Sequence, residues 1–393
     1  MASDIFTLNA GSSSLKFSLW QSGTGMELRE LFRGEVEKIG IAPHLSASGP
    51  GSDTVIDKRF GEGGDKLTHE DLLRELFAWL SRQRKGEFKA IGHRIVHGGA
   101  VFTAPVRIND RVMEKLSQLE PLAPLHQPHN LSGIRTCAVL RPHVPQVACF
   151  DTAFHQTMDP LARRLGLPRA YDKEGVRRYG FHGLSYEFIA QRLRVIDPDL
   201  AHGRVIVAHL GNGASLCAMR DRRSIDTTMG FTALDGLLMG TRPGTLDPGA
   251  VTYLMREHAM NAGEIEDVLY HRSGLVGISG ISSDMRTLLG SGDPHAREAV
   301  DLFVFRATRE IGALVASLGG LDGLVFTAGI GEHAPEIRSS VCARCAWLGV
   351  ILDERTNDAG QTRISAEASR VRVYVIPTDE ERMIAEHTAR HVA

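Results

Sequence analysis

Two segments of the chain share one pattern, a polar turn that contains glycine and separates two short apolar strands. The first segment covers residues 5–19 and reads IFTLNAGSSSLKFSL. The second covers residues 205–219 and reads VIVAHLGNGASLCAM. Gly11 and Gly211 lie 200 residues apart (211 − 11), about half of the chain. A repeat with this period predicts two copies of one α/β domain rather than a solenoid.

The rest of the chain alternates helix and strand patterns, as α/β proteins do. Apolar residues recur at helical spacing over 72–80 and again over 302–314. Short apolar runs at 147–150, 324–327 and 371–376 predict strands. The alternation therefore supports the α/β class over an all-helical or all-β fold.

Two further segments carry weaker signals. Residues 40–66 are rich in Gly, Ser and Asp, which predicts loops and a poorly packed hairpin. After Pro377, Thr378 and Glu381 have the spacing of a capping box, so we expect the last helix to begin there.

Composition excludes several classes of protein. Hydrophobic residues make up 42% of the 393 residues and charged residues 23%, which is enough for two or three domains with real cores. Lys and Arg total 45 and Asp and Glu total 47. The resulting net charge of −2 argues against a nucleic-acid partner or a polybasic membrane contact.

The cysteines and the N-terminus indicate a cytoplasmic protein. Five cysteines form no disulfide framework, and the single CxxC, Cys342 with Cys345, has no second pair beside it. The N-terminus lacks a basic segment followed by an apolar run, so we expect no secretory leader. No run of about 18 apolar residues occurs, so we expect no membrane span.

Three turns have the composition of phosphate-binding loops. Residues 9–14 combine small residues with hydroxyls, so backbone N–H groups can approach an anion closely, and Lys16 follows one strand step later. Residues 209–213 offer two glycines and an amide, and residues 329–332 follow a buried strand. An ordinary hairpin is the alternative for each turn. Neither a Walker P-loop nor a complete G-x-G-x-x-G motif occurs.

One predicted strand, 91–96, carries a candidate carboxylate site. Side chains alternate along a strand, so Arg94 and Val96 share a face. A guanidinium fork beside a small apolar side chain suits a short carboxylic acid, and a structural salt bridge is the alternative. Asp151 closes the next strand, where a carboxylate is often functional in α/β folds, and a turn cap is the alternative.

Loops supply further candidates. Phe181 and His182 precede a predicted helix, and Arg242 lies in a glycine-proline loop that suits an anion site better than a core. Glu380 falls in the first turn of the last helix, where stabilisation of the helix dipole is the alternative role. His126 and His129 have chelating spacing, but the prolines beside them predict a bent loop and weaken that interpretation.

Ten short motifs, taken together, closely resemble the acetate kinase family. In chain order they are NAGSSSLKF (9–17), GHRIVHGG (92–99), LAPLH (122–126), FDTAFH (150–155), RYGFHG (178–183), HLGNGAS (209–215), GTR (240–242), DMR (284–286), AGIGE (328–332) and TDEE (378–381). The resemblance implies the acetate and sugar kinase, Hsp70 and actin fold, with two duplicated α/β domains and a nucleotide cleft between them. We expect an acyl- and phosphate-side domain at 1–151 with 381–393, and a nucleotide-binding domain at 152–380.

The same resemblance implies Mg²⁺, with Mn²⁺ as its alternative, and ATP as co-substrate. Asp151 would be the catalytic carboxylate near the metal, and His182 and Arg242 would stabilise the transition state. The implied ligands are Asn9 and Glu380 for the metal; Ser12, Ser14 and Lys16 for the phosphates; Arg94 for the acyl carboxylate; Val96, Leu125 and Phe181 for its methyl pocket; His126, His182 and Arg242 for the γ-phosphoryl group; and His209, Leu210, Gly211, Asn212, Gly213, Asp284, Met285, Arg286, Gly329, Ile330, Gly331, Glu332 and His333 for the nucleotide.

The implied chemistry needs no general base. A carboxylic acid with a pKa of about 4.3 is already ionised at pH 7, so the nucleophile is ready. Phosphoryl transfer then depends on alignment and on positive charge around the phosphoryl oxygens. We therefore hypothesise that Asp151 orients a metal-bound water or the substrate rather than removing a proton.

Several residues depart from the family pattern. Leu184 and Tyr186 replace a threonine and a histidine, and Pro243 and Thr245 change the arginine loop, where an aspartate is usual in place of Thr245. Ala233 replaces a proline expected to wall the acyl pocket, which would enlarge that pocket, and His333 replaces an asparagine. The reaction class is unaffected, but the choice of acid is open.

We thus expect an acetate kinase that forms acetyl phosphate and ADP reversibly, acts in the cytoplasm and, by the resemblance, is a homodimer. A propionate or butyrate kinase is the nearest alternative. An actin- or Hsp70-like ATP-driven switch is the alternative from another class, and a phosphatase of the same superfamily is a third. We expect no nucleic-acid or membrane partner.

Overall fold

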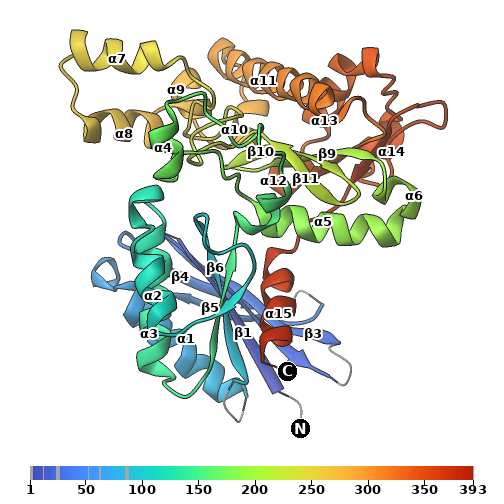
Figure 1. The fold of residues 1–393 in the computed structure, drawn as a ribbon. Coiled ribbons are helices and arrows are strands. Elements are labelled where there is room, and N and C mark those ends of the chain that lie inside the picture. Colours follow the sequence, from blue (N-terminus) through green and yellow to red (C-terminus); the bar gives the residue numbers. More distant parts are fainter. Residues whose placement is uncertain are drawn as a thin grey trace. The chain divides into compact units, whose positions relative to one another are not determined.

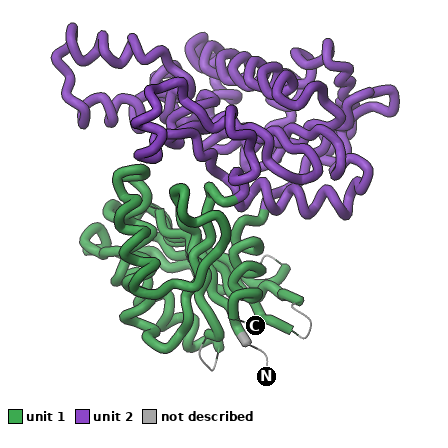
Figure 2. The backbone as a smooth tube through the Cα atoms, viewed as in Figure 1, with its two compact units in different colours: residues 1–153, 379–393 green, residues 154–378 purple. Residues whose placement is uncertain are grey.

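The computed structural model describes residues 3–11, 13–23, 27–51, 53–61, 63–84 and 88–392. The chain forms two compact units (Figure 2). Unit 1 comprises residues 1–153 and 379–393, and unit 2 comprises residues 154–378. The roles predicted for the two domains, acyl side and nucleotide side, stay predictions.

Unit 1 is built on an eight-stranded sheet with the order β5-β4-β3-β2-β1-β6-β8-β7. The central strands β1, β6 and β8 are parallel neighbours, whereas β2 to β5 continue the sheet as an antiparallel meander. The strands are β1 (Ser3–Ala10), β2 (Leu15–Ser22), β3 (Leu28–Glu37), β4 (His44–Ser48), β5 (Thr54–Arg59), β6 (Ala90–Ile95), β7 (Val106–Arg107) and β8 (Gln146–Phe150).

Helices cover both faces of this sheet (Figure 1). Phe6 and Leu8 of β1 join a core with α1, while Ile5, on the opposite face, packs against Ala385 and Ala389 of α15. This division follows from the alternation of side chains along a strand. The helices are α1 (His69–Gln83), α2 (Asp110–Ser117), α3 (Gln127–Leu140) and α15 (Glu380–His391), with 3-10 turns η2 (Gly64–Lys66) and η3 (Glu120–Leu122).

Unit 2 repeats the central topology of unit 1. Its sheet has the order β11-β10-β9-β12-β13, with β9, β12 and β13 parallel and β9, β10 and β11 antiparallel. The order β3-β2-β1-β6-β8 of unit 1 has the same pattern of parallel and antiparallel pairs, which confirms the predicted duplication. The strands are β9 (Arg204–Leu210), β10 (Ala214–Arg220), β11 (Arg223–Thr227), β12 (Gly323–Thr327) and β13 (Arg372–Val375).

Helix α5 packs on one face of the unit 2 sheet and α11 on the other (Figure 1). Val205 and Val207 of β9 face α5 and share its core. The helices are α4 (Arg169–Lys173), α5 (Gly183–Ile196), α6 (Pro198–Ala201), α7 (Pro248–Glu257), α8 (Ala262–His271), α9 (Gly274–Ser279), α10 (Met285–Leu289), α11 (Pro294–Leu318), α12 (Ala328–His333), α13 (Pro335–Arg344) and α14 (Glu354–Asp358), with 3-10 turns η4 (Ala153–Thr157) and η5 (Ala346–Leu348).

Most predicted elements are confirmed, but three local predictions are wrong. Residues 329–332 lie inside helix α12 rather than in a turn. Helix α3 begins at Gln127, with proline in its first turn, so 125–129 is not wholly a bent loop. Asp379 rather than Thr378 caps α15, because its carboxylate accepts from the backbone N–H of Arg382.

The hairpin expected within residues 40–66 is confirmed as β4 and β5. It is less loosely attached than predicted, because β4 pairs with β3 and buries Leu45 and Ala47 in the core. The strand β5 at the edge of the sheet is largely exposed.

Close contact between α15 and β6 predicts that Gly92 is required for the stability of unit 1. A Cβ atom on Gly92 would lie 2.2 Å from Thr388 Oγ1 and 2.6 Å from Ile384 Cγ2, both on α15. We expect Gly92→Ala to lower the free energy of unfolding by about 2–3 kcal/mol in urea denaturation, since overpacking forces the helix outward. Gly61→Ala is the matched control, because no atom lies within 4 Å of its Cβ position. Equal stability of the two variants would contradict this packing.

Candidate functional site

Polar side chains of unit 1 gather where its three parallel central strands end. Asn9 lies near the end of β1, Arg94 near the end of β6, and Asp151 directly after β8. The carboxyl ends of parallel neighbours meet at one edge of a sheet, which is where α/β folds place their sites. Arg94 and Gly92 share one face of β6, and Gly92 contacts α15. Arg94 therefore meets Glu380, the first residue of α15.

Arg94 forms a bidentate ion pair with Asp151. Its Nε lies 2.9 Å from Asp151 Oδ1, and its Nη2 lies 2.6 Å from Asp151 Oδ2. The third nitrogen, Nη1, lies 3.7 Å from Glu380 Oε2. The Asp151 side chain is only 2% exposed. Burial opposes the charge of Arg94, but Asp151 and then Glu380 outweigh it, so the pKa of Arg94 is raised above its ordinary value.

The structural salt bridge that the sequence left open for Arg94 is therefore present. The Arg94 side chain as a whole nevertheless keeps 19% of its exposure. Val96 is half-buried directly after β6, and its backbone N–H donates to Asn130. Asn130, which the sequence analysis did not single out, also donates to the carbonyl of Ala10, so one buried amide joins the ends of β1 and β6.

Most of the other predicted residues of unit 1 lie in the segments that adjoin these strands. Ser12 lies outside the described residues. The Ser14 carbonyl accepts from the N–H of Gly11 and closes the turn between β1 and β2. Lys16 is exposed on β2, opposite Asn9 in the antiparallel pair. Leu125 and His126 are half-buried just before α3.

Lys16 also lines a hollow of about 430 Å³ on the sheet of unit 1. Arg33 and Glu381 line it as well, and they form an ion pair of 3.2 Å. Arg33 further contacts Asp379, the cap of α15, at 2.7 Å. Arg33 thus pairs with the residues directly before and after Glu380, and these two ion pairs fix the start of α15.

Imidazole rings form the centre of the site in unit 2. His182 is the N-cap of α5 and has a left-handed backbone conformation, with φ of 56°. Its ring stacks on that of His209, with ring centroids 4.0 Å apart. His209 of β9 and Ser215 of β10 are directly paired and lie on the face of the sheet toward α5. Ser215 Oγ lies 2.9 Å from His182 Nδ1.

Arg242 lies beside His182 at Gly213. Its Cβ position would lie 3.0 Å from Arg242 Nη2 and 3.4 Å from His182 Nε2, so both nitrogens lie over this glycine. Arg242 Nη1 donates to the carbonyl of Ala233 at 2.7 Å. Burial lowers the pKa of Arg242, and Tyr270 partly offsets that effect. Gly213 has no side chain that would cover Arg242 Nη2. A guanidinium in such surroundings is suited to bind an anion.

The loop that carries Arg242 also contacts the turn between β9 and β10. The N–H of Gly240 donates to the carbonyl of Asn212, and a Cβ on Gly240 would lie 1.9 Å from Asn212 Oδ1. A larger residue at position 240 would force the Asn212 side chain to move. The predicted residues 209–213 and 240–242 therefore form one cluster in unit 2.

Other predicted nucleotide ligands have structural partners. Asp284 caps α10 and pairs with Arg286, which is 86% exposed. Glu332 Oε1 accepts from the backbone N–H groups of Ala328 and Thr378, so this carboxylate holds the protein backbone. His333 is exposed. The remaining members lie in β9 and its turn (Leu210, Gly211), in α10 (Met285) and in α12 (Gly329, Ile330, Gly331).

Sequence reasoning missed several residues that hold this cluster. Ser185 Oγ lies 2.8 Å from His209 Nδ1 and 2.8 Å from Thr378 Oγ1. Arg338 is fully buried and donates to the carbonyls of Gly331 and Glu332 at the end of α12. No motif marks such partners, because their contacts join segments far apart in the sequence.

Two departures from the family pattern have local compensation. The hydroxyl of Tyr186 reaches Ser215 Oγ, which in turn contacts His182. Thr245, where the pattern has an aspartate, donates to Asp235 Oδ1 at 2.9 Å, so a carboxylate still lies at that loop.

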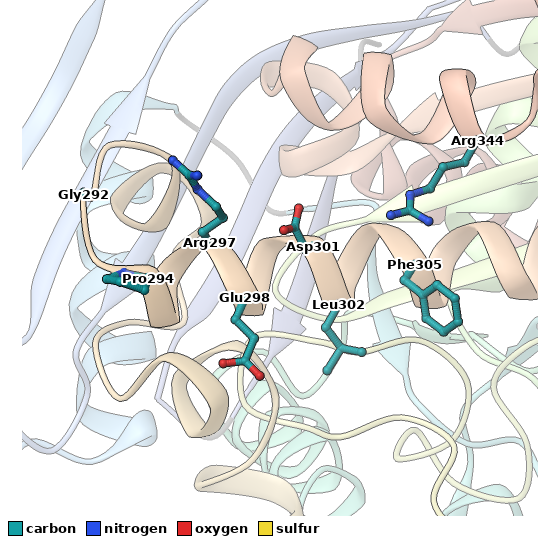
Figure 3. A pocket seen from close by; sticks show the side chains of 8 residues that line it. All are labelled: Gly292, Pro294, Arg297, Glu298, Asp301, Leu302, Phe305 and Arg344. Carbon is teal, nitrogen blue, oxygen red and sulfur yellow. The ribbon is translucent and has the colours of Figure 1, made fainter.

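A larger hollow, of about 690 Å³, lies on the outer surface of α11 (Figure 3). Its lining comes from residues 292–305 and from Arg344, and it includes none of the predicted site residues. The nearby Cys342 and Cys345 are free and buried, and burial raises the pKa of the Cys345 thiol to about 11. That environment suits an inert thiol rather than a redox or zinc site.

Oxygen donors suitable for a metal occur in unit 1. Within the described ranges, no three His, Cys, Asp or Glu side chains gather closely enough to hold an ion. Mg²⁺ is usually held by one or two carboxylates together with water and substrate phosphates. Asn9, Asp151 and Glu380 offer such oxygens, so the donor set fits a hard cation. No helix in the described part of the chain has the length and apolar character that a membrane crossing requires.

Comparisons with known proteins agree with this arrangement. The sequence model of the acetokinase family matches residues 4–386. An acetate kinase of Rhodopseudomonas palustris (strain ATCC BAA-98 / CGA009) is 53% identical over 395 residues, covering 99% of this chain and 98% of that protein. A propionate kinase from Francisella tularensis subsp. tularensis SCHU S4 gives a TM-score of 0.91 at 38% identity, covering 99% of each chain. Porphyromonas gingivalis acetate kinase gives a TM-score of 0.87 at 37% identity, covering 100% of each chain.

The fold and these matches define a phosphotransferase of the acetate and sugar kinase, Hsp70 and actin fold, with a carboxyl group as acceptor. The chain belongs to the acetokinase family, whose members use ATP as co-substrate. The predicted fold class and reaction class are confirmed, and the alternative of an ATP-driven switch is set aside. The roles of individual site residues stay predictions.

His155 is buried against the segment that precedes His182, and this burial predicts that the protein is less stable in acid. Its Nε2 lies 2.8 Å from the Phe181 carbonyl, and burial lowers the pKa of His155 to about 4. Between pH 6.5 and 4 the unfolded chain binds more protons there, so stability falls as the pH falls, by about 1.4 kcal/mol per pH unit from this group.

We expect His155→Gln to remove this part of the slope in urea denaturation at pH 6.5, 5.5 and 4.5. The exposed His295 provides the control variant His295→Gln, which should keep the wild-type slope. An unchanged slope in His155→Gln would show that His155 is not held neutral.

Proposed function

We propose that this protein transfers the γ-phosphoryl group of ATP to acetate, reversibly, with acetyl phosphate and ADP as products. The observation that carries the proposal is the convergence of Arg242 Nη2 and His182 Nε2 over Gly213. Two basic groups at a glycine turn suit a transferring phosphoryl group, whose charge is spread over three oxygens.

Unit 1 binds the acid in this proposal. The acetate carboxylate pairs with Arg94, whose orientation is fixed by its bidentate contact with Asp151. Val96 and Leu125 contact the methyl group, and the acetate kinase resemblance adds Phe181 of unit 2. The carboxylate is ionised at neutral pH and attacks the phosphorus without a general base.

Unit 2 binds the phosphoryl group and the nucleotide. His182 and Arg242 donate hydrogen bonds to the phosphoryl oxygens, and His126 of unit 1 assists them. The turn 209–213, the segment 284–286 and helix α12 hold the nucleotide. The resemblance adds Ser12, Ser14 and Lys16 of unit 1 as contacts of the phosphates.

Mg²⁺ is the cofactor we propose, with Mn²⁺ as its substitute. Asn9 and Glu380 hold or orient the ion, and Asp151 lies beside them. When bound, the ion neutralises charge on the phosphate oxygens. We also propose a cytoplasmic homodimer without nucleic-acid or membrane partners.

Propionate is the second candidate acceptor. Ala233 replaces a proline expected in the wall of the acyl pocket, and a relative with a similar structure is named a propionate kinase. Ala233 also uses its carbonyl to hold Arg242, so any extra space arises beside the phosphoryl-binding group. Val96 favours acetate because it fills the pocket.

The direct test is acyl-phosphate formation trapped with hydroxylamine, with Mg-ATP and acetate, propionate or butyrate in parallel. We expect acetate to give the highest rate, and a blank without acid to give no product. A higher rate with propionate would assign the Ala233 change to specificity. Equal ADP formation with and without acid would refute the proposal.

The Arg94–Asp151 pair gives a sharper prediction. Asp151→Asn keeps the shape but removes the charge that fixes Arg94, so we expect kcat/KM for acetate to fall on the order of 100-fold. KM for ATP should change less than KM for acetate, because the proposed metal ligands Asn9 and Glu380 stay in place.

Steady-state kinetics of Asp151→Asn, Arg94→Gln and the double variant measure the coupling of the pair. The double variant should be no worse than the poorer single variant, since residues that act as a unit are not additive. Near-full activity of Asp151→Asn, or losses that multiply in the double variant, would contradict the assignment.

A further inference from the structure

Tyr186 is one of the departures from the family pattern. It stands where the family pattern has a histidine, four residues after His182 on α5. The side chain is fully buried, and its ring lies edge-on to those of His155 and His209. A buried phenol on the face of α5 toward the sheet needs a partner for its hydroxyl.

Ser215 connects this phenol to His182. Tyr186 Oη lies 2.5 Å from Ser215 Oγ, and Ser215 Oγ lies 2.9 Å from His182 Nδ1. The other ring nitrogen of His182, Nε2, lies over Gly213 beside Arg242 Nη2. The hydrogen-bonded series Tyr186–Ser215–His182 therefore ends at His182 Nδ1. The other nitrogen, Nε2, is the one proposed to contact the phosphoryl group.

The hydrogen bonds allow only a limited set of proton positions. A phenol is a better donor and a poorer acceptor than an alkyl hydroxyl, so Tyr186 donates to Ser215. Ser215 then donates its single proton to His182 Nδ1. That nitrogen must be unprotonated, which places the proton of a neutral imidazole on Nε2. A second proton on His182 would make Ser215 accept from both Tyr186 and His182, so the hydroxyl proton of Ser215 would lose its acceptor.

The surroundings of His182 favour the same state. Among the described residues of unit 2, the ionisable groups found beside His182 include His209 from β9, Arg242 from the loop before α7 and Tyr186 on its own helix, while β10 contributes Ser215. The guanidinium of Arg242 is positively charged, so a positive charge on His182 beside it would be repelled. A neutral ring with its proton on Nε2 can still donate to a phosphoryl oxygen.

We propose that Tyr186 is a positioning residue that acts through Ser215 and holds His182 neutral, with its proton on Nε2 directed toward the phosphoryl group. This inference rests on the proposed function, because it assigns His182 the task of donating to that group. It also gives the departure at position 186 a chemical role.

The test compares Tyr186→Phe with Tyr179→Phe. Both variants remove one buried phenol hydroxyl from unit 2, but that of Tyr179 donates to the Gly175 carbonyl instead. We expect Tyr186→Phe to lower kcat on the order of tenfold near pH 7 and to leave KM for acetate and ATP within about twofold. The acidic limb of its kcat–pH profile should move to higher pH, because the bias against protonation is removed. Tyr179→Phe should keep the wild-type profile.

A spectroscopic readout separates this inference from the proposed function. ¹⁵N imidazole NMR of the full chain, with the His182 signals assigned by their loss in His182→Gln, reports which ring nitrogen carries the proton. We expect the Nε2–H form in the wild type and in Tyr179→Phe, and a mixture of forms in Tyr186→Phe.

Two results overturn the inference. One is an Nδ1–H form of His182 in the wild type. The other is a Tyr186→Phe enzyme whose loss of kcat is the same at every pH, because that describes a merely structural tyrosine. A protein without acetate-dependent activity would refute the proposed function alone, and the NMR result would still decide the role of Tyr186.

Discussion

The alternation of side chains along the central strands is the constraint on which both halves of the site depend. In unit 1, Gly92 and Arg94 share the face of β6 that α15 covers, so α15 begins at Glu380 beside the guanidinium. In unit 2, His209 and Ser215 share the face that α5 covers, so α5 begins at His182 beside them. A shift of one residue in either strand would place these groups on the other face.

Buried charge sets the second condition, and the two arginines satisfy it differently. Arg94 has carboxylate partners, Asp151 and Glu380, which stabilise its charge and fix its orientation. Arg242 donates to the backbone carbonyl of Ala233, and burial lowers its pKa. A guanidinium stabilised by a carbonyl rather than by a carboxylate retains more of its attraction for an anionic ligand. This difference supports the phosphoryl-binding role proposed for Arg242.

Sequence reasoning could predict the features that local patterns encode. The repeated strand–turn–strand segments predicted the duplication, and helical spacing predicted α1 and α11. Both patterns can be recognised within a short stretch of sequence. It could not predict which carboxylate Arg94 pairs with, since Asp151 lies 57 residues away. It also placed the start of α15 at Thr378, because the capping-box spacing there competes with Asp379, whose carboxylate forms the cap.

The departures from the family pattern show why single positions are weak guides to a site. Taken alone, Tyr186 removes an imidazole and Thr245 removes a carboxylate. In the fold, the Tyr186 hydroxyl extends through Ser215 to His182, and Thr245 binds the carboxylate of Asp235. Each substitution changes the group that supplies a hydrogen bond and leaves a polar contact in place. What the site conserves physically is a satisfied partner for each buried polar group, and that requirement can be met by residues that no linear motif contains.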